Sequence, residues 1–275
     1  MLVTADWLYK HLEDPEVVII DCRFDLSNPK LGWSQYQEGH IPKAIYLDLE
    51  KDLSGPVQEH GGRHPLPDMQ EFVGKMGSYG IDEEKHVIVY DNQSGAMAAR
   101  CWFLLTYMGH PQVSLLEGGY DHWVQQGYPI SDEKPIPNKT RFIPNFQSNM
   151  VASMNDVKDA LERGVILIDS RAPERYQGKE EPLDKKAGHI PGAINHFWKR
   201  NFAKGQYWKT VDQLQEDWKD TLQGEKDVIL YCGSGVTACV NLFALYHIGV
   251  RRARLYPGSW SDWISYPDNP IAPEE

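Results

Sequence analysis

The sequence predicts two tandem α/β domains, each with a mainly parallel sheet flanked by helices. The first observation is an internal repeat, because V-I-I-D-C-R at Val18–Arg23 returns as I-L-I-D-S-R at Ile166–Arg171. The second is the tetrapeptide G-H-I-P, which occurs at Gly39–Pro42 and again at Gly188–Pro191. The third is the alternation of short apolar runs with helical patterns in both halves, which is typical of parallel sheets. Since the matches keep their order and nearly their spacing, we interpret the chain as a duplication.

In the first copy, three apolar runs are predicted as strands because they are too brief for helices and rich in β-branched residues. These runs lie near Val17–Asp21, Val87–Tyr90 and Val113–Leu115. Three helices are predicted between and after them, near Met69–Met76, Gly95–Met108 and Gly119–Gln126.

The second copy repeats this pattern, with strands predicted near Val165–Asp169, Val228–Tyr231 and Ala253–Leu255. Between the copies, residues 131–150 contain three prolines and many polar residues, which indicates a linker. We therefore expect domains at 1–130 and 151–275, joined by a linker at 131–150.

Composition excludes several classes of partner. The chain has 275 residues and a formal net charge of −11, without a Lys/Arg cluster, so neither nucleic acid nor a membrane surface is an expected partner. No apolar run approaches the ~20 residues of a spanning helix, and the N-terminus lacks the features of an export signal. The four cysteines form no C-x-x-C pair, which favours a reducing, cytoplasmic location.

The candidate nucleophile is Cys232, which follows the apolar run Val228–Tyr231 and opens C-G-S-G-V-T. A helical pattern begins at Val236, so the cysteine is predicted at a sharp turn from a strand into a helix. Inward backbone N–H groups and the helix dipole favour negative charge there, and the thiolate is the nucleophilic form of cysteine. A buried, inert cysteine is the alternative interpretation.

The first copy has Asp91 at the position of Cys232, and its loop to Gly95 is one residue longer than the loop from Cys232 to Gly235. We therefore expect the first domain to be inactive. The carboxylate of Asp91 is predicted to cap its own helix.

These residues resemble the rhodanese and 3-mercaptopyruvate sulfurtransferase family. The resemblance is carried by the two tandem copies, the D-C-R and D-S-R segments, both G-H-I-P motifs and a C-G-S-G-V-T loop found only in the second copy. It covers essentially the whole chain. It implies an inactive N-terminal and a catalytic C-terminal rhodanese-like domain. It also implies that Cys232 takes a sulfane sulfur from 3-mercaptopyruvate or thiosulfate and passes it, as a persulfide, to a thiol or cyanide.

The resemblance and the loop chemistry together define the candidate site. A persulfide anion would be stabilised by inward N–H groups of the loop, and the two glycines allow the backbone to approach closely. Ser234 and Thr237 are predicted to add hydroxyl donors, with capping of the helix as the alternative role of Thr237. Arg175 matches a family arginine that binds the donor. The second family arginine falls where this chain has Glu181-Pro182-Leu183-Asp184, followed by two lysines. The substrate-binding candidates are Arg175, Gly233, Ser234, Gly235, Val236 and Thr237, with Arg63, His64, Lys185 and Lys186 as further candidates.

No metal or organic cofactor is predicted, because the histidines are not set at ligand spacing. A cysteine phosphatase is disfavoured, since its C-x5-R loop needs an arginine where this chain has Ala238. A non-enzymatic persulfide carrier, which would deliver sulfur to a partner without turnover, remains the alternative function.

Overall fold

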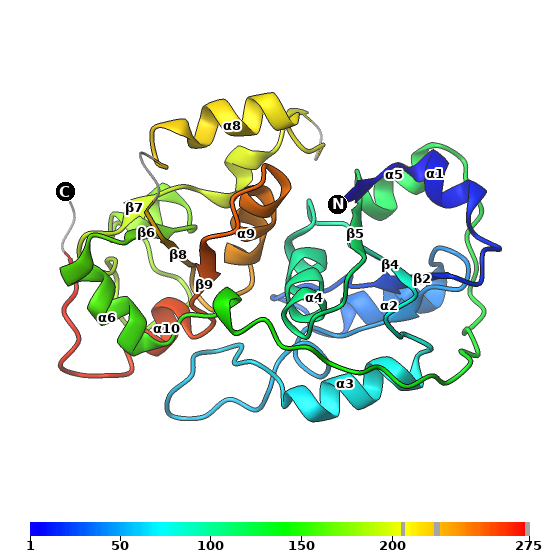
Figure 1. Ribbon diagram of the computed structural model, residues 1–275, viewed down its shortest axis with the longest axis horizontal. Helices are drawn as coiled ribbons and strands as arrows, with labels where there is room; N and C mark the ends of the chain where they lie inside the picture. Colours follow the sequence, from blue (N-terminus) through cyan, green and yellow to red (C-terminus); the bar gives the residue numbers. More distant parts are fainter. Residues whose placement is uncertain (205–206, 223–225, 273–275) are drawn as a thin grey trace. The chain divides into compact units, whose positions relative to one another are not determined.

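The computed structural model describes residues 1–204, 207–222 and 226–272, which form two compact units (Figure 1). The first unit contains residues 1–55 and 66–147, with Lys204, Tyr207 and Trp208. The second contains residues 56–65, 148–203 and the described chain from residue 209 onward. Residues 56–65 therefore belong to the second unit although they lie in the first half of the sequence.

The first unit is built on a parallel sheet with the strand order β1-β5-β4-β2-β3. Its strands are β1 (Leu2–Val3), β2 (Val17–Asp21), β3 (Ile45–Tyr46), β4 (His86–Tyr90) and β5 (Val113–Leu116). Its helices are α1 (Ala5–Lys10), α2 (Leu31–Glu38), α3 (Met69–Ser78), α4 (Ala96–Tyr107) and α5 (Gly119–Gln125). Helices α1 and α5 cover one face of the sheet, where Trp123 is completely buried, and α4 packs against the other (Figure 1).

The second unit has a parallel sheet with the order β7-β6-β8-β9. Its strands are β6 (Ile166–Asp169), β7 (Ile194–Asn195), β8 (Val228–Tyr231) and β9 (Ala253–Leu255). Its α-helices are α6 (Met154–Arg163), α7 (Pro173–Tyr176), α8 (Val211–Lys219), α9 (Ala238–His247) and α10 (Ser259–Trp263), and its 3₁₀ helices are η1 (Ser148–Met150) and η2 (Trp198–Asn201).

Strand β8 is buried on both faces, as a central strand of a parallel sheet must be. Ile229 and Tyr231 pack towards α6 and α10, together with Trp260 and Trp263. Helix α9 packs on the opposite side from α6 and α10 (Figure 1). The nucleophile loop begins where β8 ends, so it is anchored in the buried core of this unit.

The predicted fold class is confirmed, and each of the six predicted strands corresponds to an observed strand within one residue. The two-residue strands β1, β3 and β7 were not predicted, because runs this short carry no periodicity. Helix α9 begins at Ala238 rather than Val236, since Val236 and Thr237 still belong to the turn.

The segment between the copies has no helix or strand from residue 132 to 147. It nevertheless pairs with the first unit, where the N–H groups of Thr140, Asn145 and Gln147 donate to backbone carbonyls, and Phe142 is buried. None of the described helices is long and apolar enough to cross a membrane.

Candidate active site

Cys232 lies at the turn between β8 and α9, as predicted, and only 2% of its surface is exposed. Gly235 within the turn has φ of +74°, and a Cβ at this position would lie 2.2 Å from the carbonyl oxygen of Pro257. Glycine is therefore required there both by the backbone conformation and by the space. Thr237 occupies the N-cap position of α9, but its hydroxyl makes no capping hydrogen bond, so the suggested side-chain cap is wrong.

The start of α10 holds the nucleophile loop in place. The N–H of Cys232 donates to Oγ of Ser259 (3.1 Å), and its carbonyl accepts from the N–H of Trp260 (3.0 Å). The carbonyl of Gly233 accepts from the N–H of Ser261 (2.9 Å). These bonds use the carbonyls of Cys232 and Gly233 and the N–H of Cys232, and they leave the N–H groups of Ser234, Val236 and Thr237 unused. Within the described part of the chain, these three N–H groups have no acceptor.

The corresponding loop of the first unit shows what such N–H groups bind. Asp91 is 1% exposed, and its carboxylate accepts four backbone N–H groups at 2.8–3.0 Å, those of Gln93, Gly95, Met97 and Ala98. The predicted helix cap is confirmed. Burial raises the pKa of Asp91, although the four donors act in the opposite direction. The backbone N–H groups of the loop after β4 thus converge on one anionic group, the carboxylate of Asp91 in the same loop.

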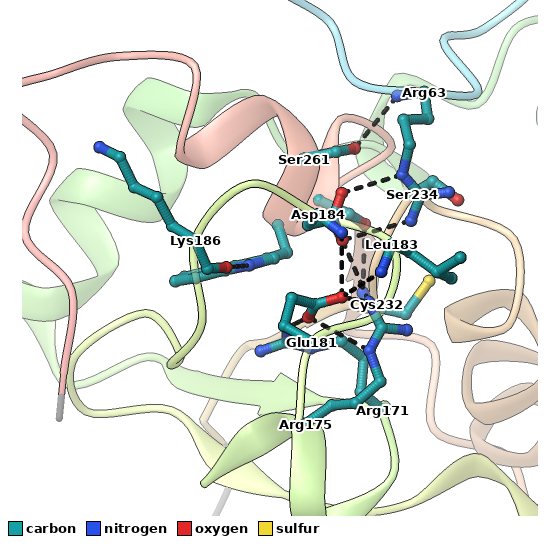
Figure 2. Close-up of polar contacts among 12 residues, drawn as sticks. Arg63, Arg171, Arg175, Glu181, Leu183, Asp184, Lys186, Cys232, Ser234 and Ser261 are labelled. Atoms are coloured by element: carbon teal, nitrogen blue, oxygen red, sulfur yellow. Dashed lines mark hydrogen bonds and ion pairs between the residues drawn. The ribbon is translucent and has the colours of Figure 1, made fainter. Parts of the chain in front are cut away.

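Two arginines lie beside the loop of the second unit (Figure 2). A Cβ on Gly233 would lie 2.9 Å from Nη2 of Arg63 and 3.4 Å from Nη2 of Arg175. Any side chain at this position would therefore make the guanidinium group of Arg63 shift away from the position next to Cys232. The structure thus brings Arg63, Arg175 and the loop together.

Both arginines are paired with acidic residues that were not predicted as part of the site. Asp184 accepts from Nε of Arg63 (2.9 Å) and from Nη2 of Arg175 (3.0 Å) (Figure 2). Glu181 accepts from Nη2 of Arg175 (2.7 Å) and from Nη1 of Arg171 (3.2 Å). Burial would raise the pKa of Glu181, but hydrogen bonds and charge from Arg175, with further backbone donors, bring it below its ordinary value.

Glu181 also shapes the segment that carries Asp184. One of its oxygens accepts the N–H groups of Leu183 (3.1 Å) and Asp184 (3.0 Å), which turns the chain back on itself. The sequence carries no local signal for this turn, because the side chains that typically cap such turns are those of Asp, Asn, Ser and Thr rather than Glu.

The pair formed by Asp169 and Arg171 has a structural role, because the same pair recurs in the first unit, which has no nucleophile. Arg171 donates to Asp169 through Nε and Nη2 and to the carbonyl of Gly188 (2.7 Å). Arg23 makes the same contacts with Asp21 and the carbonyl of Gly39 in the first unit. The pair therefore ties the end of a central strand to the G-H-I-P turn in both units.

His64 contacts the loop directly, since its Nδ1 lies 2.8 Å from Oγ of Ser234. The segment that carries it is fixed to α10: the N–H of Gly61 donates to Asp262 (2.7 Å), and the N–H of Arg63 donates to Oγ of Ser261 (3.1 Å). Sequence reasoning missed Ser259, Ser261 and Asp262, because short polar residues at a helix start resemble ordinary caps.

The two lysines predicted as further candidates are not brought into this cluster. Lys185 and Lys186 are exposed, and neither forms an ion pair with another described residue. Lys186 points away from the arginines, while its carbonyl accepts from Nε1 of Trp260 (Figure 2). The turn set by Glu181 places Asp184, rather than the lysines, against the arginines.

The other three cysteines are buried and form no disulfide bond. Cys22 contacts Cys101, and burial raises the pKa of the Cys22 thiol well above its ordinary value. Cys239 donates to the carbonyl of Gly235 from inside α9. Over residues 1–204, 207–222 and 226–272, no group of three histidine, cysteine or acidic residues lies close enough to hold a metal ion.

Two parallel-sheet units, with a cysteine at the strand–helix turn of the second, define a class of protein. The model of the rhodanese-like domain family matches residues 4–126 and again residues 153–266, so the chain belongs to this family with two copies of the domain.

Its relatives identify the enzyme class. The chain is 39% identical to the probable 3-mercaptopyruvate sulfurtransferase of Pseudomonas aeruginosa over 276 residues, which cover 98% of this chain and 97% of the relative. It is 36% identical to a putative thiosulfate sulfurtransferase of Mycobacterium tuberculosis, with 98% and 96% covered. The crystal structure of the 3-mercaptopyruvate sulfurtransferase SseA from Escherichia coli superposes with a TM-score of 0.83 at 34% identity, covering 94% of this chain and 98% of that one. The chain is a sulfurtransferase of the tandem rhodanese type.

Proposed function

We propose that the second unit moves a sulfane sulfur from 3-mercaptopyruvate or thiosulfate, through a persulfide on Cys232, to a thiol or cyanide. The observation that carries this proposal is the match between two loops. In the first unit, backbone N–H groups bind the carboxylate oxygens of Asp91, which are the δ atoms of that side chain. A persulfide on Cys232 places its terminal, charged sulfur at the same δ position, ~2 Å beyond the thiol sulfur. The N–H groups of Ser234, Val236 and Thr237 are the donors for that charge.

The reaction divides into two displacements that balance. With 3-mercaptopyruvate, the Cys232 thiolate attacks the donor sulfur, the carbon–sulfur bond breaks, and the enolate of pyruvate leaves and takes up a proton. With thiosulfate, the sulfur–sulfur bond breaks and sulfite leaves. In the second displacement, cyanide or a thiolate attacks the terminal sulfur, which leaves as thiocyanate or a new persulfide and regenerates the thiolate.

Arg63 and Arg175 are proposed to bind the anionic end of the donor, because both guanidinium groups lie beside Gly233. Gly233, Ser234, Gly235, Val236 and Thr237 form the wall that receives the transferred sulfur. Because Asp91 occupies the position that corresponds to Cys232, we propose that the first domain is inactive and that the second domain holds the single active site. The spacing of the four cysteines, which includes no C-x-x-C pair, supports a reducing compartment, and we place the protein in the cytoplasm.

Steady-state kinetics with both donors test this function. Cys232→Ser should abolish thiocyanate formation, while Cys22→Ser, Cys101→Ser and Cys239→Ser should retain most of it. Mass spectrometry after loading with donor alone should show one added sulfur on the peptide that contains Cys232. Many turnovers per chain distinguish the enzyme from a persulfide carrier, and transfer by Cys232→Ser would refute the proposal.

A further inference from the structure

The charges around the nucleophile loop cancel. Three arginines, Arg63, Arg171 and Arg175, face three carboxylates, Asp169, Glu181 and Asp184, in one connected set of ion pairs. Figure 2 shows the part of this set in which Asp184 lies against Arg63 and Arg175. The acidic side chains are 0–4% exposed, whereas those of Arg63 and Arg175 are 30% and 18% exposed. The arginines are therefore the members of the set that a ligand can reach, and buried acids compensate their charge.

Asp184 is shared between the two accessible arginines. Its Oδ1 accepts from Nε of Arg63, and its Oδ2 accepts from Nη2 of both Arg63 (3.3 Å) and Arg175 (3.0 Å). The Nε and Nη2 edge of Arg175 is further occupied by Glu181. Among the described residues, neither arginine uses Nη1 in a hydrogen bond, so these nitrogens are the donors left for a ligand.

The donor's anionic group must lie close to Asp184. A donor whose sulfur reaches Cys232 passes Gly233, and both guanidinium groups lie within 3.4 Å of the Cβ position of that glycine. An anion bound by their remaining N–H groups is then separated from the Asp184 carboxylate by little more than the width of a guanidinium group. Asp184 is 2% exposed, so water screens this repulsion poorly.

We propose that Asp184 is a specificity-determining residue: as a fixed counter-ion of Arg63 and Arg175, it makes the site select singly charged sulfur donors over doubly charged ones. This inference rests on the proposed function of Cys232. The donor class is a monoanionic carboxylate such as an α-keto acid, and a dianion such as thiosulfate is disfavoured. The repulsion between Asp184 and a bound anion is proportional to the charge of that anion. A dianion therefore incurs twice the free-energy cost of a monoanion, and the factor by which its affinity is reduced is the square of the factor for the monoanion.

Calorimetric titration of the unloaded full-length chain tests this without any turnover. The probes are pyruvate, a monoanion, and sulfate, a dianion, at low ionic strength. In Asp184→Asn, which has nearly the same shape, the Kd for pyruvate should fall about 10-fold and the Kd for sulfate about 100-fold. Glu174→Gln is the matched control, because it removes an exposed carboxylate next to Arg175 in sequence and should leave both Kd values near wild type.

Asp184→Glu keeps the charge and should keep the preference for pyruvate, and Asp184→Ser replaces Asp184→Asn if that variant fails to fold. The inference would be overturned if Asp184→Asn changed the Kd for pyruvate and for sulfate by the same factor, or by no more than Glu174→Gln does. Weaker binding of the anions in Asp184→Asn would overturn it as well. Weaker binding would mean that Asp184 only positions the arginines. In steady-state assays, the ratio of kcat/KM for thiosulfate to that for 3-mercaptopyruvate should rise in Asp184→Asn. The titration of anions needs no sulfur transfer. It can therefore contradict the role of Asp184 while the Cys232→Ser experiment supports the proposed function, and the opposite result is equally possible.

Discussion

The imidazole Nδ1 of His64 lies 2.8 Å from the hydroxyl oxygen of Ser234, two positions after the nucleophile. Both residues are buried, with 5% and 7% of their surfaces exposed. A hydroxyl has no preferred direction by itself, so the contact with His64 gives the Ser234 side chain a defined orientation next to the donor. This pair links the segment 56–65 to the chemistry of the loop.

Ser234→Ala and His64→Ala should each lower kcat/KM for the donor by about 3- to 10-fold, the equivalent of one neutral hydrogen bond. Because the two side chains act through one contact, the double variant should lose little more than the worse single variant. The measurement is a double-mutant cycle on kcat/KM, with thermal midpoints to verify folding. Losses that simply multiply would show that the two residues act independently.

The contact between Arg63 and Ser261 provides a second test of how this segment is held. Ser261→Ala removes the acceptor of the Arg63 N–H, so Arg63 should be less well placed and the donor KM should rise about 3- to 10-fold. Ser265→Ala is the control, because its hydroxyl contacts Nδ1 of His60 at an exposed position of the same segment. An equal rise of KM in both variants would indicate a general loosening of the segment.

Asp91 is predicted to stabilise the first unit without supporting chemistry. In Asp91→Asn, an NH2 group replaces an oxygen that accepts the N–H groups of Met97 and Ala98. These two backbone donors would then face a third donor and lose their acceptor. The free energy of unfolding should fall by about 2–4 kcal/mol, while kcat/KM per folded molecule stays unchanged. Chemical denaturation beside steady-state kinetics measures both quantities.

Asp91→Cys tests the loop itself. The loop after Asp91 is one residue longer than the loop after Cys232, so we expect no second persulfide. A labelled donor should load one sulfur per chain in the wild type and in this variant. A second equivalent of sulfur on the introduced thiol would contradict the argument from loop length.

The sequence was most informative where the fold repeats itself. The strand end at Asp21 recurs at Asp169, and the G-H-I-P motif occurs once in each copy although only the second copy has the nucleophile. Symmetry alone therefore favours a structural role for both features. Cys232 could be placed at a strand–helix turn because a brief apolar run, two glycines and a helical pattern follow one another without a gap.

The ion pairs around Arg175 could not be predicted in the same way. Contacts between Arg63 and Asp184 join residues 121 positions apart, and no local pattern encodes them. Lys185 and Lys186 were candidates because of their charge, but the direction of a side chain depends on the turn that Glu181 makes with the N–H groups of Leu183 and Asp184. Charge can be read from a sequence, whereas orientation depends on the folded chain.

Arg175 provides the last prediction, which separates binding from folding. Arg175→Ala should lower kcat/KM for both donors by roughly 30- to 1000-fold, through the loss of a charge-assisted contact worth ~2–4 kcal/mol. Arg175→Lys should recover only part of this, because a point charge replaces a planar group. Stability should fall as well, because Glu181 and Asp184 are buried and lose a partner.

Kinetics per folded molecule and a test of each displacement separate these effects. Enzyme loaded in advance with persulfide should react with cyanide at nearly the wild-type rate in Arg175→Ala, because that step no longer involves the donor's anionic group. The whole decrease in kcat/KM should appear in the rate at which 3-mercaptopyruvate loads sulfur onto the enzyme. If both rates fall equally, or if kcat/KM per folded molecule stays at the wild-type value, Arg175 serves the fold through Glu181 and Asp184. Arg63 is then left as the donor-binding cation beside Gly233.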